Sequence, residues 1–436
     1  MKKFFTTIKN IFAIEDLRVR ILNTIGFLII FRLGSYIVLP GVDANLLAGN
    51  QGGIFDLLNT FLGGSFSRAS IFALGIMPYI SASIVVQLLT VAVPHFTKMQ
   101  KEGDSGRNKL NQFTRVLTIA ITAAQSYGYL RTTINAEALT NPGMFWMVSS
   151  IIILISGTMF CMWLGERITD KGIGNGISML IMIGIVSRFP AAIWQEMDAK
   201  GMNGALLFII ELLALFFVVV GVIALTQATR RIPVQYAKQV VGNKLYGGKR
   251  DFIPLKLNSA GVMPIIFAQA LMFIPPLLAG IWRDSDLGAY VGSTFADFTS
   301  WQYNLLFAIL ILLFTFFYTA ITVPTNDIAD NLKRNGGFVP GIKPGKQTAE
   351  FIDGILSKIT FPGAIFLAIV AILPAFAVRA GVTQNFAQFY GGTSLLILVG
   401  VVLDTLQQIE SYLLMRHYEG MMKSGRVKGR SQFAAA

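Results

Sequence analysis

Long apolar runs alternate with short charged segments along almost the whole chain. Each run is close to the roughly 20 residues that a helix needs to cross the hydrocarbon core of a bilayer. Ten runs can be placed, at about 21–40, 71–91, 113–130, 144–164, 173–190, 205–226, 260–281, 303–324, 360–378 and 393–415. This pattern predicts an all-α polytopic membrane protein with ten transmembrane helices.

A different pattern lies just before the second of these runs. Apolar residues recur there at the spacing of an amphipathic helix: Ile54, Phe55, Leu57, Leu58, Phe61 and Leu62. Nine helical residues rise only about 13 Å, so this helix cannot cross a membrane. Gly63 and Gly64 then interrupt it. On pattern alone, a movable element beside a membrane path and an amphipathic helix at the membrane surface are equally consistent interpretations.

Composition also places the chain in a membrane. Hydrophobic residues make up 54% of the 436 residues, and the mean hydropathy of +0.61 is too high for an ordinary soluble protein. The single cysteine, Cys161, lies within an apolar run, which excludes a disulfide framework and a thiolate metal site. His95 and His417 are far apart in the sequence and are interpreted as surface residues.

Positive charge is distributed unequally between the two sides of the predicted membrane. The net charge is +13, and most of the 36 Lys and Arg residues fall on the side that holds both termini. The opposite side holds Arg68, Arg131, Arg188, Lys200, Arg283 and Arg379, and Arg32 falls within a run. Because Lys and Arg are retained in cytosolic loops, we expect both termini in the cytosol.

The first 20 residues predict a basic amphipathic helix on the inner membrane surface. A signal peptide is the competing interpretation. The apolar run that follows is long, contains Arg32 and is not followed by a small-residue cleavage site, which argues against a signal peptide.

Two cytosolic segments, at about 227–259 and 325–359, are too long for simple connections and are rich in Lys, Arg, Gly and Pro. Long loops in a compact protein usually serve a function. A basic, extended loop suits a polyanion such as ribosomal RNA, or an acidic groove on a soluble partner.

The sequence contains no recognisable catalytic motif. The stretch from Gly341 to Thr348 resembles a phosphate-binding loop, but its spacing is wrong and Gln347 stands where Ser or Thr would ligate magnesium. The glycine-rich stretch 171–176 precedes an apolar run, so its glycines predict a turn and a close approach of helices. We therefore predict no enzymatic activity, no cofactor and no metal site.

The ionisable residues that we place within the membrane are few: Arg32, Glu211 near the end of its span, Asp404 and Glu410. Ion-coupled transporters usually carry such groups near the middle of the membrane, and Asp404 is the candidate for that role. A structural partner for a buried donor is the simpler interpretation of Asp404, and a packed structural charge is that of Arg32.

Two pairs of isoleucines, Ile76 with Ile80 and Ile181 with Ile185, are spaced by four residues, so each pair shares one face of a helix. Isoleucines in a membrane span usually pack against lipid or against a protein core, so this spacing alone does not indicate a pore.

Several longer motifs occur in order along the chain: SRASIFALGIMPYISAS at 67–83, KEGDSGR at 101–107, WLGE at 163–166, GIGNGIS at 172–178, RIPVQYAK at 231–238, AGVMP at 260–264, DNLK at 330–333, GFVPG at 337–341 and GGTSLLI at 391–397. On these motifs the chain resembles the SecY family, the central subunits of the bacterial Sec protein-conducting channel, from about residue 15 to 425.

The resemblance implies an hourglass pore between two inverted five-helix halves, residues 1–190 and 191–436, that opens sideways to lipid. By motif position it implies a hydrophobic pore ring of Ile76, Ile80, Ile181, Ile185, Ile266 and Ile397. The short helix at about 54–66 matches the family's plug. A lateral gate is implied between the second and third and the seventh and eighth spans, with Gln87 and Asn258 in its polar cluster.

The resemblance also implies a function. The chain would conduct unfolded preproteins across the bacterial cytoplasmic membrane and release transmembrane segments into the lipid bilayer. The implied partners are the membrane subunits SecE and SecG, the SecA motor ATPase, the ribosome, and signal peptides with their preproteins. The residues expected to contact cytosolic partners are Arg230, Arg231, Lys238, Lys249, Arg250 and Lys343.

One position departs from the family. Lys343 stands where the family usually has arginine, and lysine keeps the charge but lacks the planar guanidinium. Two other classes of function stay open. A secondary transporter would require Asp404 as a titrating group, and a scaffold for other membrane subunits would need neither a pore ring nor a plug.

Overall fold

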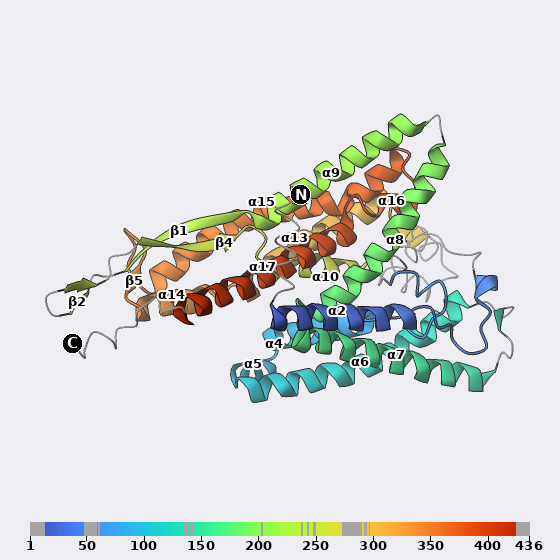
Figure 1. The fold of residues 1–436 in the computed structure, drawn as a ribbon, viewed down its shortest axis with the longest axis horizontal. Helices are drawn as coiled ribbons and strands as arrows, with labels where there is room; N and C mark the ends of the chain where they lie inside the picture. The colour runs from blue at the N-terminus through green and yellow to red at the C-terminus, as the bar shows by residue number, and fades with distance from the viewer. Residues whose placement is uncertain are drawn as a thin grey trace. The chain divides into compact units, whose positions relative to one another are not determined.

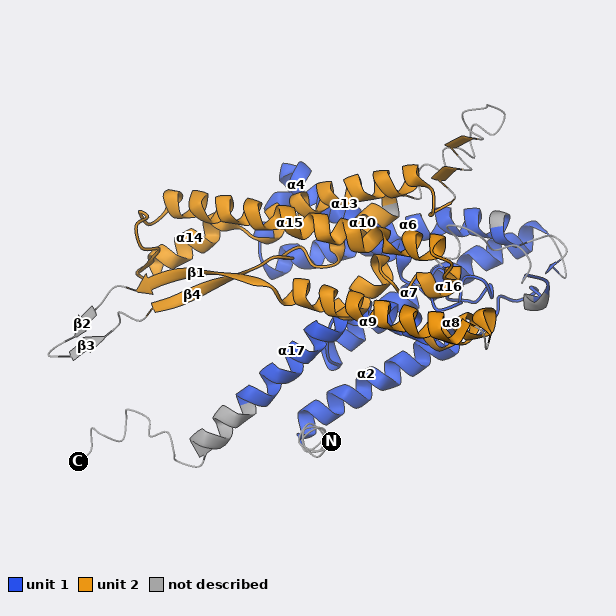
Figure 2. Cartoon of the chain, turned by 90° about the horizontal axis from the view of Figure 1, so that it is seen from above, with its two compact units in different colours: residues 1–188, 401–436 blue, residues 189–400 orange. Residues whose placement is uncertain are grey.

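The computed structural model describes residues 14–47, 59, 62–134, 138–139, 143–201, 204–236, 239–241, 244–246, 250–272, 290–291, 294–295 and 297–423. The chain, drawn as a ribbon in Figure 1, forms two compact units, which Figure 2 shows in different colours. Unit 1 comprises 1–188 and 401–436, and unit 2 comprises 189–400. Both divisions fall inside helices, so α8 (Gly176–Lys200) and α17 (Gly392–Lys423) each continue from one unit into the other. The division at residues 190 and 191 that the resemblance implies stays a prediction.

Unit 1 is helical. Besides its parts of α8 and α17 it contains α2 (Glu15–Gly34), the short 3-10 helix η1 (Ala44–Leu47), α4 (Met77–Ala92), α5 (Pro94–Lys101), α6 (Asp104–Thr133) and α7 (Met144–Lys171).

The predicted span at 71–91 is helical only from Met77 onward, since Gly75 has a φ of +50° and Pro78 occupies the first turn of α4. Proline is favoured in the first turn because its missing amide costs no helical hydrogen bond there. At the other end, Pro94 follows the break, and α5 is bent by 99° from α4.

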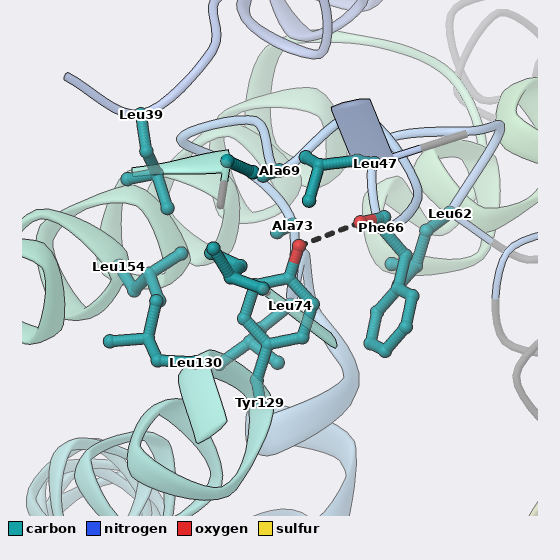
Figure 3. Close-up of a cluster of buried hydrophobic side chains, with 12 residues drawn as sticks. Leu39, Leu47, Leu62, Phe66, Ala69, Ala73, Leu74, Tyr129, Leu130 and Leu154 are labelled. Carbon is teal, nitrogen blue, oxygen red and sulfur yellow. Dashed lines mark hydrogen bonds between the residues drawn. The ribbon is translucent and has the colours of Figure 1, made fainter. Parts of the chain in front are cut away.

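A cluster of buried apolar side chains holds the segment before α4 in unit 1 (Figure 3). Leu62 and Phe66 from this segment pack with Leu130 and Leu154, which lie on α6 and α7. The Tyr129 hydroxyl donates to the carbonyl oxygen of Phe66 at 2.6 Å, and the two rings meet edge to face at 4.6 Å. The chain leading into α4 is therefore anchored by both burial and hydrogen bonding.

Unit 2 combines helices with small sheets. Its described elements, besides its parts of α8 and α17, are α9 (Ala205–Gln227), β1 (Thr229–Tyr236), β2 (Gln239–Val241), β3 (Lys244–Tyr246), β4 (Arg250–Lys256), α10 (Met263–Leu271), α13 (Trp301–Thr322), α14 (Thr325–Arg334), β5 (Gly337–Phe338), α15 (Lys346–Arg379) and α16 (Gln384–Ala387).

The segment at 227–259 is an antiparallel hairpin in its described parts rather than an extended loop. β1 pairs with β4, with Ile232 opposite Ile253, and the short β5 joins the other edge of β1 in the order β4-β1-β5. Side chains alternate across a strand, so Ile232 and Val234 face a buried cluster that includes Leu332 of α14 and Ile352 of α15. Figure 1 shows the strands beside these two helices.

Six of the described helical stretches are long and apolar enough to cross a membrane, or seven if the bent pair α4–α5 is one span. They are 144–171, 176–200, 205–227, 301–334, 346–379 and 392–415. The helices α2, α6 and α10 also lie at predicted spans, but α2 carries three arginines, α6 is rich in hydroxyl and amide side chains, and α10 is short. The all-α polytopic prediction is confirmed, with the small sheets as an addition.

Candidate functional site

Four of the isoleucines assigned to the pore ring lie in unit 1, and all four are buried, at most 8% exposed. Ile76 caps the start of α4, and its carbonyl oxygen accepts from the amide of Ile80 at 3.1 Å, so the two residues lie one helical turn apart. Ile181 and Ile185 are likewise one turn apart on α8. The local geometry therefore agrees with the shared faces that the spacing predicted.

The glycine hinge after the predicted plug packs directly against α8. Gly63 and Gly64 have φ of +61° and +90°, which only glycine adopts without strain. A Cβ atom on Gly63 would lie 3.0 Å from both the Cα of Gly184 and the Oγ of Ser187. The hinge thus lies against the turn of α8 that contains Ile185.

Most of the predicted plug falls outside the described residues, namely Ile54, Phe55, Leu57, Leu58 and Phe61. Of the others, Leu62 belongs to the buried cluster of Figure 3. Asn59 is described as well; its backbone oxygen accepts from Gly64 and its side-chain oxygen from the amide of Ser67. The amphipathic helix stays a prediction, while its C-terminal attachment is described.

The remaining assigned isoleucines lie in unit 2. Ile397 in the first turns of α17 is buried, and Ile266 of α10 is half-buried. Of the two residues assigned to the lateral gate, Gln87 of α4 donates to the Ser83 hydroxyl at 3.3 Å. Asn258, between β4 and α10, is buried, and its Oδ1 has no hydrogen-bond partner among the described residues.

The described residues assigned to cytosolic contacts are all exposed: Arg230, Arg231, Arg250 and Lys343. Lys238 and Lys249 lie outside the described residues. In the register of the hairpin, Thr229 faces Lys256, Arg231 faces Pro254 and Gln235 faces Arg250. These pairs lie on the face of the hairpin opposite to the buried Ile232. That face therefore carries three cationic side chains, those of Arg231, Arg250 and Lys256.

Lys343 lies in the turn between β5 and α15, where the Thr348 hydroxyl donates to the Lys343 carbonyl oxygen at 2.9 Å. The turn is built on Gly341 and Gly345, both with positive φ. The backbone at Lys343 is thus fixed while its side chain stays in solvent.

The glycine-rich turn between α7 and α8 confirms the predicted close approach. A Cβ on Gly176 would lie 1.9 Å from the carbonyl oxygen of Gly165. Two more helices of unit 1 hold the turn by hydrogen bonds. The Thr24 hydroxyl of α2 accepts from the Ile173 amide, and the Gln408 side chain of α17 accepts from the Gly174 amide at 2.8 Å.

Unit 2 contains a buried ionic cluster that the sequence did not reveal. Lys200 at the end of α8 lies 2.8 Å from the Glu211 carboxylate and 3.5 Å from that of Glu196. The Tyr390 hydroxyl donates to the Glu211 carbonyl oxygen at 2.5 Å, and Thr383 donates to Glu196. The sequence signal that could have indicated this cluster is the spacing of Glu196 and Lys200, which are four residues apart on one helix.

Fold and site define an α-helical polytopic membrane protein with a broken helical span, a glycine hinge beside it and a basic hairpin at the end of a long helix. The family model that matches is SecY, over residues 70–406. The chain belongs to the SecY family.

Relatives of known name support this assignment. The chain is 41% identical to the protein translocase subunit SecY of Streptomyces coelicolor, covering 96% of this chain and 100% of the relative. It is 40% identical to that of Mycobacterium tuberculosis, covering 94% and 97%.

Solved structures share the fold at low identity. A protein-conducting channel matches with a TM-score of 0.63 and 16% identity over 90% of this chain and 92% of that chain. Sec61 in a canine ribosome-channel complex matches with a TM-score of 0.59 and 16% identity over the same shares.

Proposed function

We propose that this chain forms the pore through which unfolded preproteins cross the bacterial cytoplasmic membrane, and from which apolar segments leave sideways into lipid. Family membership sets the class of protein. The observation that carries the pore assignment is the packing of the Gly63 hinge against the turn of α8 that holds Ile185. This contact brings the end of the predicted plug to the helix that supplies two of the predicted ring residues.

A ring of isoleucines suits this function physically. Bulky aliphatic side chains exclude water from a constriction and so block ions by dewetting. They also yield around a passing chain without binding any one sequence strongly. The predicted plug adds a second seal, since its apolar face would seat beneath the ring at rest and leave when a substrate enters.

The lateral gate is supported by the environment of Asn258. A buried amide oxygen without a partner costs free energy, so it is expected to pair with another polar group or with water. The assignment of Gln87 and Asn258 to the polar cluster of a lateral gate rests on the motifs that the chain shares with the SecY family.

The driving force has to come from partners, because the sequence carries no nucleotide-binding motif. Arg231, Arg250 and Lys256 on the open face of the hairpin suit ribosomal RNA or an acidic groove of a motor ATPase such as SecA. Among the neighbours in fold, Sec61 is seen in a ribosome complex, which supports the ribosome as a partner. SecE and SecG complete the proposed set, with both termini in the cytosol.

An ion-coupled transporter is the alternative class, and it depends on Asp404. That residue is exposed on α17. No observation in the described part of the chain favours this alternative, so the channel is the function that we propose.

Crosslinking in membrane vesicles tests the proposal. A secretory chain with one cysteine is stalled midway, and the channel carries a cysteine at Ile80 or at Ile185. The native Cys161, buried in α7, is first changed to alanine. Val186 is the matched control, since it is the next residue on α8 and is 39% exposed.

Disulfides from Ile80→Cys and Ile185→Cys, with none from Val186→Cys, are expected if the polypeptide passes the isoleucines. No disulfide at either position, while Lys249→Cys still links to the stalled chain, would mean docking without passage and would overturn the proposal.

A further inference from the structure

The turn between α7 and α8 has two consecutive buried amides that depend on acceptors from other helices. Ile173 and Gly174 are buried, and a buried amide without an acceptor is costly. The Ile173 amide donates to the Thr24 hydroxyl of α2 at 3.0 Å, and the Gly174 amide donates to the Gln408 side chain of α17 at 2.8 Å. The conformation of the turn therefore depends on both α2 and α17.

Two glycines let α2 and α17 approach the backbone of the turn. A Cβ atom on Gly172 would lie 2.4 Å from the Thr24 hydroxyl oxygen, and one on Gly174 would lie 3.1 Å from the hydroxyl oxygen of Thr405 on α17. Gly174 also has a φ of +82°, a conformation that favours glycine. The Thr24 hydroxyl donates its own proton to the Arg20 carbonyl oxygen at 2.9 Å, which leaves its oxygen free to accept from the turn.

The polar link from the turn to α17 is a single contact. In the described part of the chain, Gln408 makes the one hydrogen bond between α17 and this turn. Thr405 donates to the Val401 carbonyl oxygen within α17, and Gln407 is exposed. Removing the Gln408 acceptor therefore leaves the Gly174 amide buried without a partner, while the hydrogen bonds between the turn and α2 stay in place.

No loop separates the turn from the isoleucines of α8. The Asn175 side chain accepts from the amides of Ile177 and Ser178, which caps the first turn of the helix, and α8 begins at Gly176. Ile181 lies five residues further on, about 7 Å along the helix axis. A displacement of the turn therefore moves the start of α8 and the isoleucine next to it.

We propose that Gln408 is a positioning residue of the pore: by holding the Gly174 amide, it fixes the start of α8 against α17 and so sets the position of the isoleucine pair on α8. This inference rests on the proposed function, because it treats Ile181 and Ile185 as members of the ring. The helix α17 also carries Ile397, eleven residues before Gln408. One hydrogen bond thus joins the two helices that supply three of the six proposed ring residues.

The test measures how fast N-ethylmaleimide alkylates a cysteine on α8 in the complete channel complex in lipid vesicles. The reporter is Ile181→Cys, with the native Cys161 changed to alanine. Gln408→Leu keeps the approximate size of the side chain and removes the acceptor. We expect alkylation of the reporter to become about threefold to tenfold faster, because the loss of one hydrogen bond raises the population with an open turn by about that factor. Gln408→Glu keeps an acceptor oxygen and should leave the rate unchanged.

Two controls separate positioning from general loosening of the complex. Gln407→Leu is the matched variant, since Gln407 is the preceding residue on α17 and is exposed, and it should leave the rate unchanged. In a second set of chains the native Cys161, fully buried in α7, is the only thiol and should stay equally protected when Gln408 is replaced. If both cysteines are alkylated faster to the same extent, the complex is loosened as a whole and the inference is overturned.

An unchanged alkylation rate at Ile181→Cys in the Gln408→Leu variant also overturns the inference. If Gln408→Leu does not assemble, Gln408→Asn takes its place, because its side chain is one methylene shorter and draws the acceptor away from Gly174. An unchanged rate for that variant overturns the inference in the same way.

Export of a reporter protein with a damaged signal peptide tests the proposed function separately. Faster alkylation together with export of this reporter supports both the positioning role and the ring. Faster alkylation with wild-type rejection of the reporter would keep the positioning role of Gln408 and contradict Ile181 as a member of the ring.

Discussion

Thr383 donates to the Glu196 carboxylate through both its backbone amide and its hydroxyl, and Glu196 is fully buried. The contact joins the segment after α15 to α8 within unit 2. A second hydrogen bond joins the same two parts of the chain, since the Lys200 ammonium of α8 donates to the Gly381 carbonyl oxygen at 2.9 Å. The segment from 381 to 391 contains α16 and leads into α17, the helix that carries Ile397.

The first prediction concerns this contact. Thr383→Val removes the hydroxyl donor from a buried carboxylate, and we expect a loss of about 1–3 kcal/mol in stability, because a buried charge that loses a partner is costly. The melting temperature of the purified complex in detergent should fall. Thr299→Val is the matched control, since its hydroxyl binds the exposed Asp297; equal melting temperatures for the two variants would contradict the prediction.

The second prediction concerns the helix contact at Gly176. Gly176→Ala would place a methyl group against the Gly165 carbonyl, and overpacking of this kind costs about 1–3 kcal/mol. A lower melting temperature and less assembled complex are expected. Gly26→Ala on α2 has open space around its Cβ and should change stability by less than about 1 kcal/mol. If both alanines behave alike, the close approach is not important for folding.

The third prediction concerns the ring. Ile397→Asn places an amide at a position that is 3% exposed, so water should enter the constriction and the channel should accept substrates with defective signal peptides. Ile397→Leu conserves volume and polarity and should keep stringency. Export of a reporter with a damaged signal peptide measures the difference. Unchanged stringency in the asparagine variant would argue against Ile397 in the ring.

The fourth prediction concerns the basic hairpin. Reversing Arg230, Arg231, Lys249 and Arg250 to glutamate should weaken binding of the ribosome and of SecA by at least about tenfold at low salt, since several charges act together. Folding should be retained, because the described members of this set are exposed.

Lys98, Lys101 and Lys109, on α5 and α6, provide a comparison set on the same predicted side. Their reversal should have a smaller effect on partner binding. Normal affinity of the hairpin variant for both partners would refute the assignment.

Hydrophobic pattern predicted the helices well, because crossing a membrane demands both length and low polarity from each helix. It placed the start of α4 too early, since 71–76 is as apolar as the helix after it. Gly75 and Pro78, rather than hydropathy, decide that boundary. The hairpin was missed because the apolar residues of its inner face, Ile232 and Val234 on β1 with Ile253 and Leu255 on β4, alternate with polar and charged residues that suggested a loop.

The candidate site was predicted only where its residues lie close together in the sequence. Spacing along one helix revealed the isoleucine pairs and the glycine turn. It could not reveal that Arg32 reaches Gly63, or that Thr383 reaches Glu196 across 187 residues of sequence. Contacts of this kind depend on tertiary packing, which leaves no local pattern in the chain.

The two helices that continue across the division between the units have a mechanical consequence. Pro190 interrupts the hydrogen bonding of α8 just after residue 188, and Gly400 lies where α17 leaves unit 2. Proline and glycine are the residues at which helices bend most readily. Each helix is therefore expected to bend most readily near this point, which in α17 lies three residues after Ile397 and in α8 five residues after Ile185. Bending at either point changes the direction of the helix axis next to an isoleucine that we propose for the ring, so we expect the side chains of Ile185 and Ile397 to shift when α8 or α17 bends.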